Sequence, residues 1–205
     1  MTFPIDFGKT LNIVAINSSV EKWDYQSPWV VKAEYEQIHK EFASWGEHVQ
    51  KVVKLLDRPE TQAWSMWYMP HAPTFTTGCV AMLGDAAHAC TPFQGQGAGQ
   101  AIEDAFVLES LFAHVDTPEK VPMAFRAYDQ IRRPRSQKVA KTSWDAGELC
   151  ALRLPGVEDR SEDFRENIDW RMDWIWHRDI AGERDEALIC FNKLLEGGSL
   201  ETVHT

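Results

Sequence analysis

One acidic side chain and a group of closely spaced glycines form the part of the sequence best suited to binding a ligand. Asp85 follows Gly84 and a short apolar run at 79–83, and about ten residues later every second residue of 95–99 is glycine. A carboxylate accepts hydrogen bonds from sugar-type hydroxyls, and glycines leave backbone N–H groups open to a ligand. The start of a helix adds about half a positive charge. The pattern predicts a ligand that is polyhydroxylated at one end and carries or develops negative charge at another.

The glycine spacing alone has an ordinary structural interpretation. The G-x-G-x-G of 95–99 differs from the G-x-G-x-x-G of dinucleotide sites, and by itself it is typical of a turn between a buried strand and a buried helix. The apolar run 79–83 predicts a strand covered on both faces. Such a strand would deliver Asp85 to its carboxyl end, where open α/β sheets bind ligands. The combination of this carboxylate with the glycines therefore favours a site.

Hydrophobic periodicity and turn residues predict the elements around this site. The expected strands are 10–17 and 64–69, and the expected helices are 33–45, 47–57, 99–113 and one that begins near 117. Pro134 should kink or end the last of these helices. Trp170, Trp174 and His177 fall on one face of a final helix. The charged stretch 158–167 is expected to be solvated, and 193–205 is expected to be a fraying tail.

Composition excludes several classes of function. The chain has 205 residues with 21 basic and 31 acidic side chains, a net charge of −10, which argues against a partner such as nucleic acid. No apolar run reaches the roughly 18 residues of a membrane helix, and no secretory signal is visible, so we expect a cytoplasmic protein without a membrane segment. The four cysteines form no C-x-x-C and the histidines no H-x-x-x-H. We therefore expect reduced thiols and no metal site.

Other polar and aromatic residues have two interpretations each. His88 is more typical of a buried hydrogen-bonding histidine than of an acid or base beside the ligand. Glu103 and Asp104 are interpreted as compensating a helix dipole rather than as catalytic. Trp170, Trp174 and Trp176 favour core packing over an aromatic pocket. A basic stretch is expected to be a solvated face, with a nucleotide-phosphate contact as the alternative; its members are Arg126, Arg132, Arg133, Arg135, Lys138 and Lys141.

The residues around Asp85 and the glycines resemble a motif of a known protein family. Residues 84–88, then Pro92, then 95–105 are similar to the second flavin motif of FAD-dependent aromatic hydroxylases, above all the fungal salicylate-hydroxylase-like branch. The flanks at 11–15, 128–135 and 169–176 resemble the same family, so the resemblance covers almost the whole chain. It implies an α/β fold: a partial FAD/NAD(P)-binding, glutathione-reductase-like fold lacking the N-terminal dinucleotide-binding unit, because G-x-G-x-x-G occurs nowhere in the sequence.

Position within the motif implies roles for five residues. Asp85 would bind the ribityl chain of FAD, the backbone amides of Gly97, Ala98 and Gly99 would approach the flavin ring near N1 and O2, and Pro92 would lie over the flavin where substrate and oxygen meet. The resemblance implies NAD(P)H as electron donor and hydroxylation of an electron-rich aromatic ring. The family's substrate-activating arginine and tyrosine would lie upstream, so the catalytic residues stay unknown.

The resemblance implies an FAD-dependent monooxygenase acting on a small phenolic or polyketide-like aromatic substrate, in fungal secondary metabolism. The alternatives are a truncated or degenerate non-catalytic homologue, or a partner subunit that completes a flavin site. We expect part of the substrate domain at 1–77, the flavin motif at 78–143 and a helical region at 144–205. If the first domain is absent, exposed apolar surface predicts an oligomer or a partner chain over it.

Overall fold

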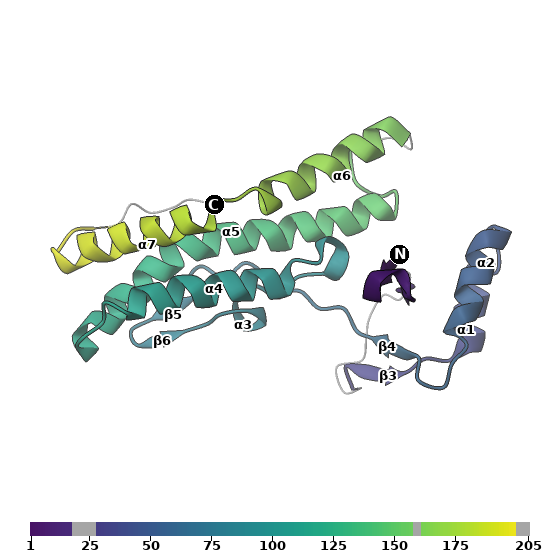
Figure 1. Ribbon diagram of the computed structural model, residues 1–205, viewed down its shortest axis with the longest axis horizontal. Coiled ribbons are helices and arrows are strands. Elements are labelled where there is room, and N and C mark those ends of the chain that lie inside the picture. The colour runs from purple at the N-terminus through teal and green to yellow at the C-terminus, as the bar shows by residue number, and fades with distance from the viewer. Residues whose placement is uncertain (18–27, 158–160, 200–205) are drawn as a thin grey trace. The chain divides into compact units, whose positions relative to one another are not determined.

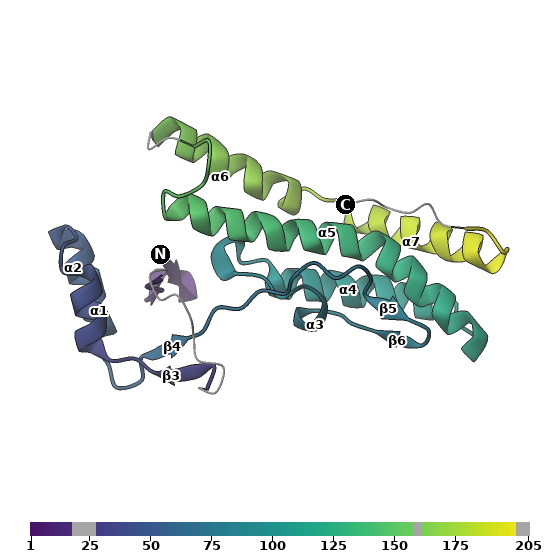
Figure 2. The ribbon, with the colours of Figure 1, turned by 180° about the vertical axis from the view of Figure 1, so that it is seen from behind.

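The computed structural model describes residues 1–17, 28–157 and 161–199. The chain forms two compact units, Met1–Ser65 and Met66–Thr205, whose elements are labelled in Figures 1 and 2. The three-part division at residues 77 and 143 concerns functional regions and stays a prediction. Within the described residues, no helix is both long enough and apolar enough to cross a membrane.

The first unit consists of two antiparallel strand pairs and short helices. Strand β1 (Thr2–Ile5) pairs with β2 (Thr10–Ile13), and β3 (Val30–Lys32) pairs with β4 (Gln62–Trp64). The helices are α1 (Tyr35–Phe42), α2 (Glu47–Val53) and the 3-10 turn η2 (Lys54–Leu56). Both predicted helices of this unit are confirmed, with shorter bounds. The strand predicted at 10–17 ends at Ile13.

The strand predicted at 64–69 is wrong. The observed strand β4 ends where the prediction begins, at Trp64. The following residues bond outside any sheet: the N–H of Met69 donates to the carbonyl of Ala89 over 2.7 Å. The alternation of side chains indicated an extended backbone but could not show whether another strand lies beside it.

The second unit is mainly helical and carries the flavin-like motif. Three long helices, α4, α5 and α7, lie side by side in both views of Figures 1 and 2. A strand pair and two short helical turns lie against them. The elements are β5 (Thr76–Thr77), β6 (Val80–Ala81), α3 (Asp85–His88), η3 (Pro92–Gln94), α4 (Gly97–Phe112), η4 (Pro118–Lys120), α5 (Val121–Cys150), α6 (Ser161–Trp176) and α7 (Ile180–Leu195).

The core of this unit lies between α4, α5 and α7. Each helix contributes apolar side chains three or four residues apart, which places them on one face. Asp179 caps α7, because its carboxylate accepts a hydrogen bond from the N–H of Gly182 over 2.9 Å. The core residues are Phe75, Ala87, Val107, Leu111, Ala124, Ala127, Tyr128, Ala187, Phe191 and Leu194.

The doubly covered strand predicted at 79–83 is wrong. Strand β6 is only two residues long and pairs with β5 alone in the part of the chain that the structure describes. Val80 is 65% exposed and Leu83 45% exposed. Burying such a strand takes strands or helices on both faces, and the described residues supply too few.

The C-terminal half also departs from the predictions. Of the two predicted effects of Pro134, ending the helix is wrong, because α5 extends from Val121 to Cys150, and a kink stays a prediction. The charged stretch 158–167 was expected to be solvated; its residues 162–167 lie in helix α6 with none of them buried, and 158–160 lie outside the described residues. Of the predicted tail, 193–195 end helix α7, and 200–205 lie outside the described residues.

Candidate functional site

A tight turn presents Asp85 to solvent. Gly84 has φ 58° and ψ −140°, a backbone conformation that side-chain-bearing residues rarely adopt. Its carbonyl accepts hydrogen bonds from the N–H groups of Ala87 and His88, both over 2.9 Å, which begins helix α3. Asp85 is exposed immediately after this glycine. The sequence therefore forms a rigid turn whose first acidic side chain is open to a ligand.

The start of helix α4 offers open backbone donors. Gly95 is left-handed, with φ 63° and ψ 25°, and ends η3 just before α4 begins at Gly97. The preceding residue, Gln96, makes no capping hydrogen bond with its side chain. The first N–H groups of a helix have no partner within it, and they lie at its positive end. The amides of Gly97, Ala98 and Gly99 thus form an end suited to an anion or a polarised carbonyl.

Cys90 lies close to both of these features. Burial raises the pKa of the Cys90 thiol, and the negative charge of Asp85 raises that pKa further. A Cβ atom placed on Gly97 would lie 3.6 Å from the Cys90 sulfur. The structure thus brings Asp85 and the start of α4 near the same thiol. Sequence reasoning missed Cys90, although its place between the two halves of the motif is a usable signal.

Helix α5 supports the loop that carries Pro92. Pro92 is exposed at the start of η3. Behind it, the hydroxyl of Thr142 donates to the side-chain oxygen of Gln94 over 3.0 Å. A Cβ atom on Gly147 would lie 2.4 Å from the ring of Phe93, so the loop packs where α5 has no side chain. The exposed position of Pro92 depends on these contacts.

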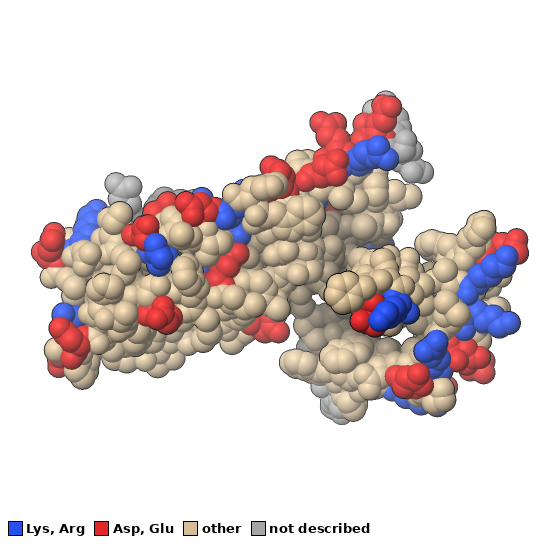
Figure 3. Space-filling model, viewed as in Figure 1, with Lys and Arg blue, Asp and Glu red and all other residues tan. Residues whose placement is uncertain are grey.

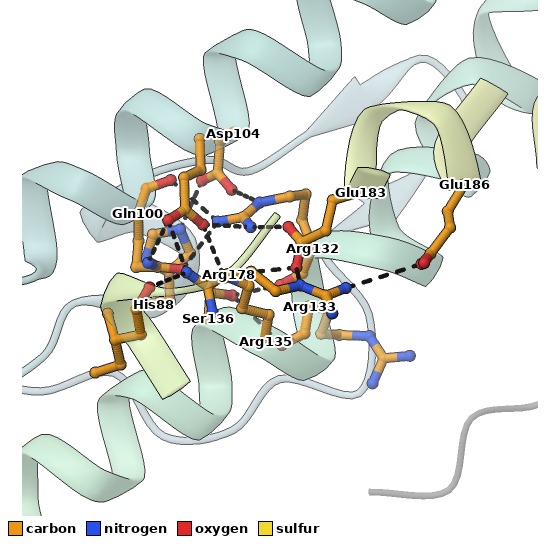
Figure 4. Close-up of polar contacts among 12 residues, drawn as sticks. His88, Gln100, Asp104, Arg132, Arg133, Arg135, Ser136, Arg178, Glu183 and Glu186 are labelled. Carbon is orange, nitrogen blue, oxygen red and sulfur yellow. Dashed lines mark hydrogen bonds and ion pairs between the residues drawn. The ribbon is translucent and has the colours of Figure 1, made fainter. Parts of the chain in front are cut away.

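Asp104 is the centre of a buried polar network, drawn in Figure 4. Its Oδ2 accepts hydrogen bonds from the N–H of Gly84 over 3.0 Å and from the imidazole Nε2–H of His88 over 2.6 Å. Its Oδ1 accepts from Nε of Arg132 over 2.9 Å. All three side chains are buried. The interpretation of His88 as a buried hydrogen-bonding residue is confirmed, and that of Asp104 as a partner of the helix dipole is wrong.

Arg132 joins several elements through one guanidinium. Its Nη2 donates to the side-chain oxygen of Gln100 over 2.9 Å and to the carbonyl of the same residue over 3.3 Å. Its Nη1 donates to Glu103 over 2.6 Å and to Glu183 over 2.8 Å. Burial works to lower the pKa of Arg132, but the charges of Glu103 and Asp104 outweigh burial and raise that pKa. The guanidinium is therefore a permanent buried cation.

The solvated face predicted for the basic stretch is wrong at two of its positions. Arg132 is fully buried, and Arg135 is 8% exposed and bonds Glu103 through Nε and Nη2 over 2.8 and 2.9 Å. Glu103 consequently serves as an ion-pair partner instead of compensating the helix dipole. Its partners on α5 lie about thirty residues further along the chain, beyond the reach of local sequence patterns.

Of the three tryptophans of α6, only Trp174 follows the core-packing interpretation. Trp174 is partly buried, and its ring lies 4.3 Å from the ammonium of Lys138. Trp170 is 48% exposed and Trp176 64% exposed. Trp170 stacks against the guanidinium of Arg171 at 4.8 Å. Packing therefore accounts for Trp174, whereas Trp170 and Trp176 lie on the surface.

The site combines an exposed acidic turn with an open helix start, on a fold of helices and short strand pairs. Residues 17–143 match the family model described as FAD binding domain, and the chain belongs to that family. The chain is 41% identical over 196 residues to a 6-methylsalicylate 1-monooxygenase of Aspergillus terreus. This match covers 96% of this chain and 43% of that protein. It is 35% identical over 192 residues to a salicylate hydroxylase of Pseudomonas putida, covering 91% and 44% of the two chains.

Comparison with solved structures gives the same class. The chain matches a salicylate hydroxylase substrate complex with a TM-score of 0.83 and 36% identity, over 91% of this chain and 46% of the other. The resemblance to flavin aromatic hydroxylases and the fold class predicted from it are confirmed. The chain spans less than half the length of the curated relatives it matches.

Proposed function

We propose that this chain supplies the ribityl- and ring-binding part of an FAD-dependent monooxygenase. The observation that carries the proposal is that the exposed Asp85 turn and the start of α4 both lie near Cys90. An exposed carboxylate suits the hydroxyls of the ribityl chain, and three uncapped amides suit the polar edge of the flavin ring. The residues present therefore fit the flavin end of FAD.

Each residue has one task in this proposal. Asp85 accepts hydrogen bonds from the ribityl chain. The amides of Gly97, Ala98 and Gly99 donate toward N1 and O2 of the ring, where the positive helix end stabilises negative charge. Pro92 borders the flavin on the side where substrate and oxygen meet. When bound, FAD supplies reduction by NAD(P)H and the activation of oxygen.

We infer the substrate class from the relatives. The names of two relatives specify 6-methylsalicylate and salicylate, and others are FAD-dependent monooxygenases of Aspergillus and Monascus species. A phenolic or polyketide-like aromatic acid, hydroxylated in the cytoplasm as part of fungal secondary metabolism, is the corresponding proposal for this chain. Such a ring is electron-rich, which favours attack by a flavin-activated oxygen.

A specific observation favours a second candidate, a chain that binds flavin only with a partner. Figure 3 shows a largely uncharged surface over α4. Apolar side chains exposed in this unit include Val80, Leu83, Ile102 and Ile189, the last two at 70% and 68%. Large exposed apolar patches are typical of an interface. In this candidate another chain covers that surface and completes the FAD site.

The visible spectrum and the turnover of the purified full chain distinguish the candidates. Bound flavin together with NAD(P)H oxidation that depends on salicylate or 6-methylsalicylate supports the monooxygenase. Bound flavin without turnover supports a flavin-binding part that is inactive alone, and contradicts the chain that needs a partner to bind flavin. A chain that remains colourless and takes up no added FAD contradicts the first candidate and is the result expected of the second.

A further inference from the structure

We propose that Arg132 is a positioning residue that fixes the position and orientation of the two halves of the flavin site relative to each other. This inference rests on the proposed function, because the halves are the Asp85 turn and the start of α4. Arg132 comes from a third element, α5, and touches neither Asp85 nor the amides of 97–99 by any hydrogen bond in the described residues. It acts through Asp104 and Gln100.

On one side, Arg132 controls the Asp85 turn. Its Nε binds Oδ1 of Asp104 at 2.9 Å, which directs Oδ2 toward the turn. That oxygen binds the N–H of Gly84 at 3.0 Å, one residue before Asp85, and the ring of His88 at the end of the same turn. Both ends of the four-residue helix α3 are thereby fixed to one carboxylate. The direction of the Asp85 side chain follows from that attachment.

On the other side, Arg132 controls the first turn of α4. Its Nη2 binds both the carbonyl and the side-chain oxygen of Gln100. Gln100 closes that turn, because its N–H donates to the carbonyl of Gln96 over 2.9 Å. The open amides of 97–99 lie between these two residues. Fixing Gln100 therefore fixes the direction in which those amides point.

Only a guanidinium can make both attachments at once. Its donors diverge in a rigid plane, so Nε reaches Asp104 while Nη2 reaches Gln100. A lysine retains the charge but offers one small ammonium. Buried ion pairs contribute uncertainly to stability, and their best-supported role is to specify one arrangement. This network fits that role, because the Asp85 turn and the start of α4 are both held by the planar guanidinium of Arg132.

The first readout is backbone amide hydrogen exchange, which NMR measures on the full chain without any flavin. In Arg132→Lys we expect faster exchange at the hydrogen-bonded amides of Gly84 and Gln100, and shifted resonances at Gly84 and at 97–100 together. The matched control is Glu183→Gln, which weakens the same network from α7 but touches neither half. It should leave those amides unchanged. If Arg132→Lys does not fold, Gln100→Ala replaces it and should affect 97–100 but spare Gly84.

The second readout is FAD affinity, measured by quenching of flavin fluorescence. Arg132→Lys, or Gln100→Ala in its place, should weaken binding about tenfold, the equivalent of one lost charge-assisted hydrogen bond, while Glu183→Gln stays within about twofold of the parent. Unchanged amides in the folded variant overturn the inference, as does unchanged affinity despite altered amides. Equal loss of affinity in Glu183→Gln also overturns it, by indicating a purely structural role. If the parent chain binds no FAD but the amides respond as expected, the positioning role stands and the proposed function falls.

Discussion

At the scale of single residues, Asp104 stays ionised where burial favours the neutral acid. Burial works to raise the pKa of Asp104, but hydrogen bonds from His88 and Gly84 and the charge of Arg132 outweigh it, so the pKa lies below its ordinary value. Burial likewise works to raise the pKa of Glu103, and its hydrogen bond and ion pairs with Arg135 and Arg132 lower it overall. Folding therefore stabilises the ionised form of both carboxyl groups relative to the neutral form.

The lowered pKa values of Asp104 and Glu103 in the folded chain determine how the free energy of unfolding changes with pH. The stability from Asp104 and Glu103 is fully present above their unfolded pKa values, about 3.9 and 4.3, and is lost as the pH falls through the lower folded values. We expect the free energy of unfolding, measured by urea titration, to decline below about pH 4. Asp104→Asn should cost about 3–5 kcal/mol at neutral pH and flatten the acid decline. The control Glu148→Gln removes an ion pair at the surface and should change the free energy of unfolding little. An acid decline as steep in Asp104→Asn as in the parent would refute this assignment.

The Cys90 thiol reports on its distance from Asp85. Because that carboxylate helps to raise the pKa of Cys90, Asp85→Asn should lower the pKa and increase the thiolate fraction. Iodoacetamide alkylation of Cys90 at about pH 8, followed by mass spectrometry, should then become faster. The exposed Cys79 provides the internal control and should react at its former rate. An unchanged rate at Cys90 would place Asp85 away from the α4 start.

At the scale of elements, α5 is the common support of the site. Arg132 near its middle holds the Asp85 turn and α4, while Thr142 and Gly147 hold the Pro92 loop. These contacts lie about ten to fifteen residues apart, and a helix rises about 1.5 Å per residue. A single helix therefore sets the spacing of the predicted site residues along its length.

Gly147 tests this support directly. Alanine is normally the better helix former, but here its Cβ would meet the Phe93 ring at 2.4 Å. We expect Gly147→Ala to lower the free energy of unfolding by about 1–3 kcal/mol, the usual cost of overpacking. In the double variant with Phe93→Ala, that penalty should largely disappear. Equal penalties with and without the Phe93 ring would mean that the loop packs elsewhere.

Local pattern predicted the helices well and long-range contacts poorly. The helix that follows the glycines was expected at 99–113 and is observed at Gly97–Phe112, because periodicity and a glycine-rich start are local signals. Pro134 was expected to kink or end its helix, and the local pattern could not decide between the two; α5 continues past it to Cys150. The burial of Arg132 was not foreseen, because its partners lie on α4 and α7. The five predicted site residues came from the motif resemblance, and their roles remain proposals.

At the scale of the whole molecule, the exposed apolar side chains predict association. Val80, Leu83 and Ile102 are all well exposed on elements next to the flavin motif. We expect sedimentation velocity to show concentration-dependent self-association of the full chain. The charged double variant Leu83→Glu with Ile102→Glu should reduce it, whereas Trp64→Glu, an exposed apolar residue of the other unit, should not. A monomer at all concentrations would argue against an uncovered interface.

The central claim is that Asp85 and the α4 amides together bind a flavin. Titration of FAD into the full chain tests it most directly, with the parent, Asp85→Ala and the remote surface variant Asp116→Ala measured side by side. The account predicts saturable binding to the parent, unchanged binding to Asp116→Ala, and binding about tenfold weaker to Asp85→Ala. Equal affinity of Asp85→Ala and the parent, or no binding by the parent, would contradict it.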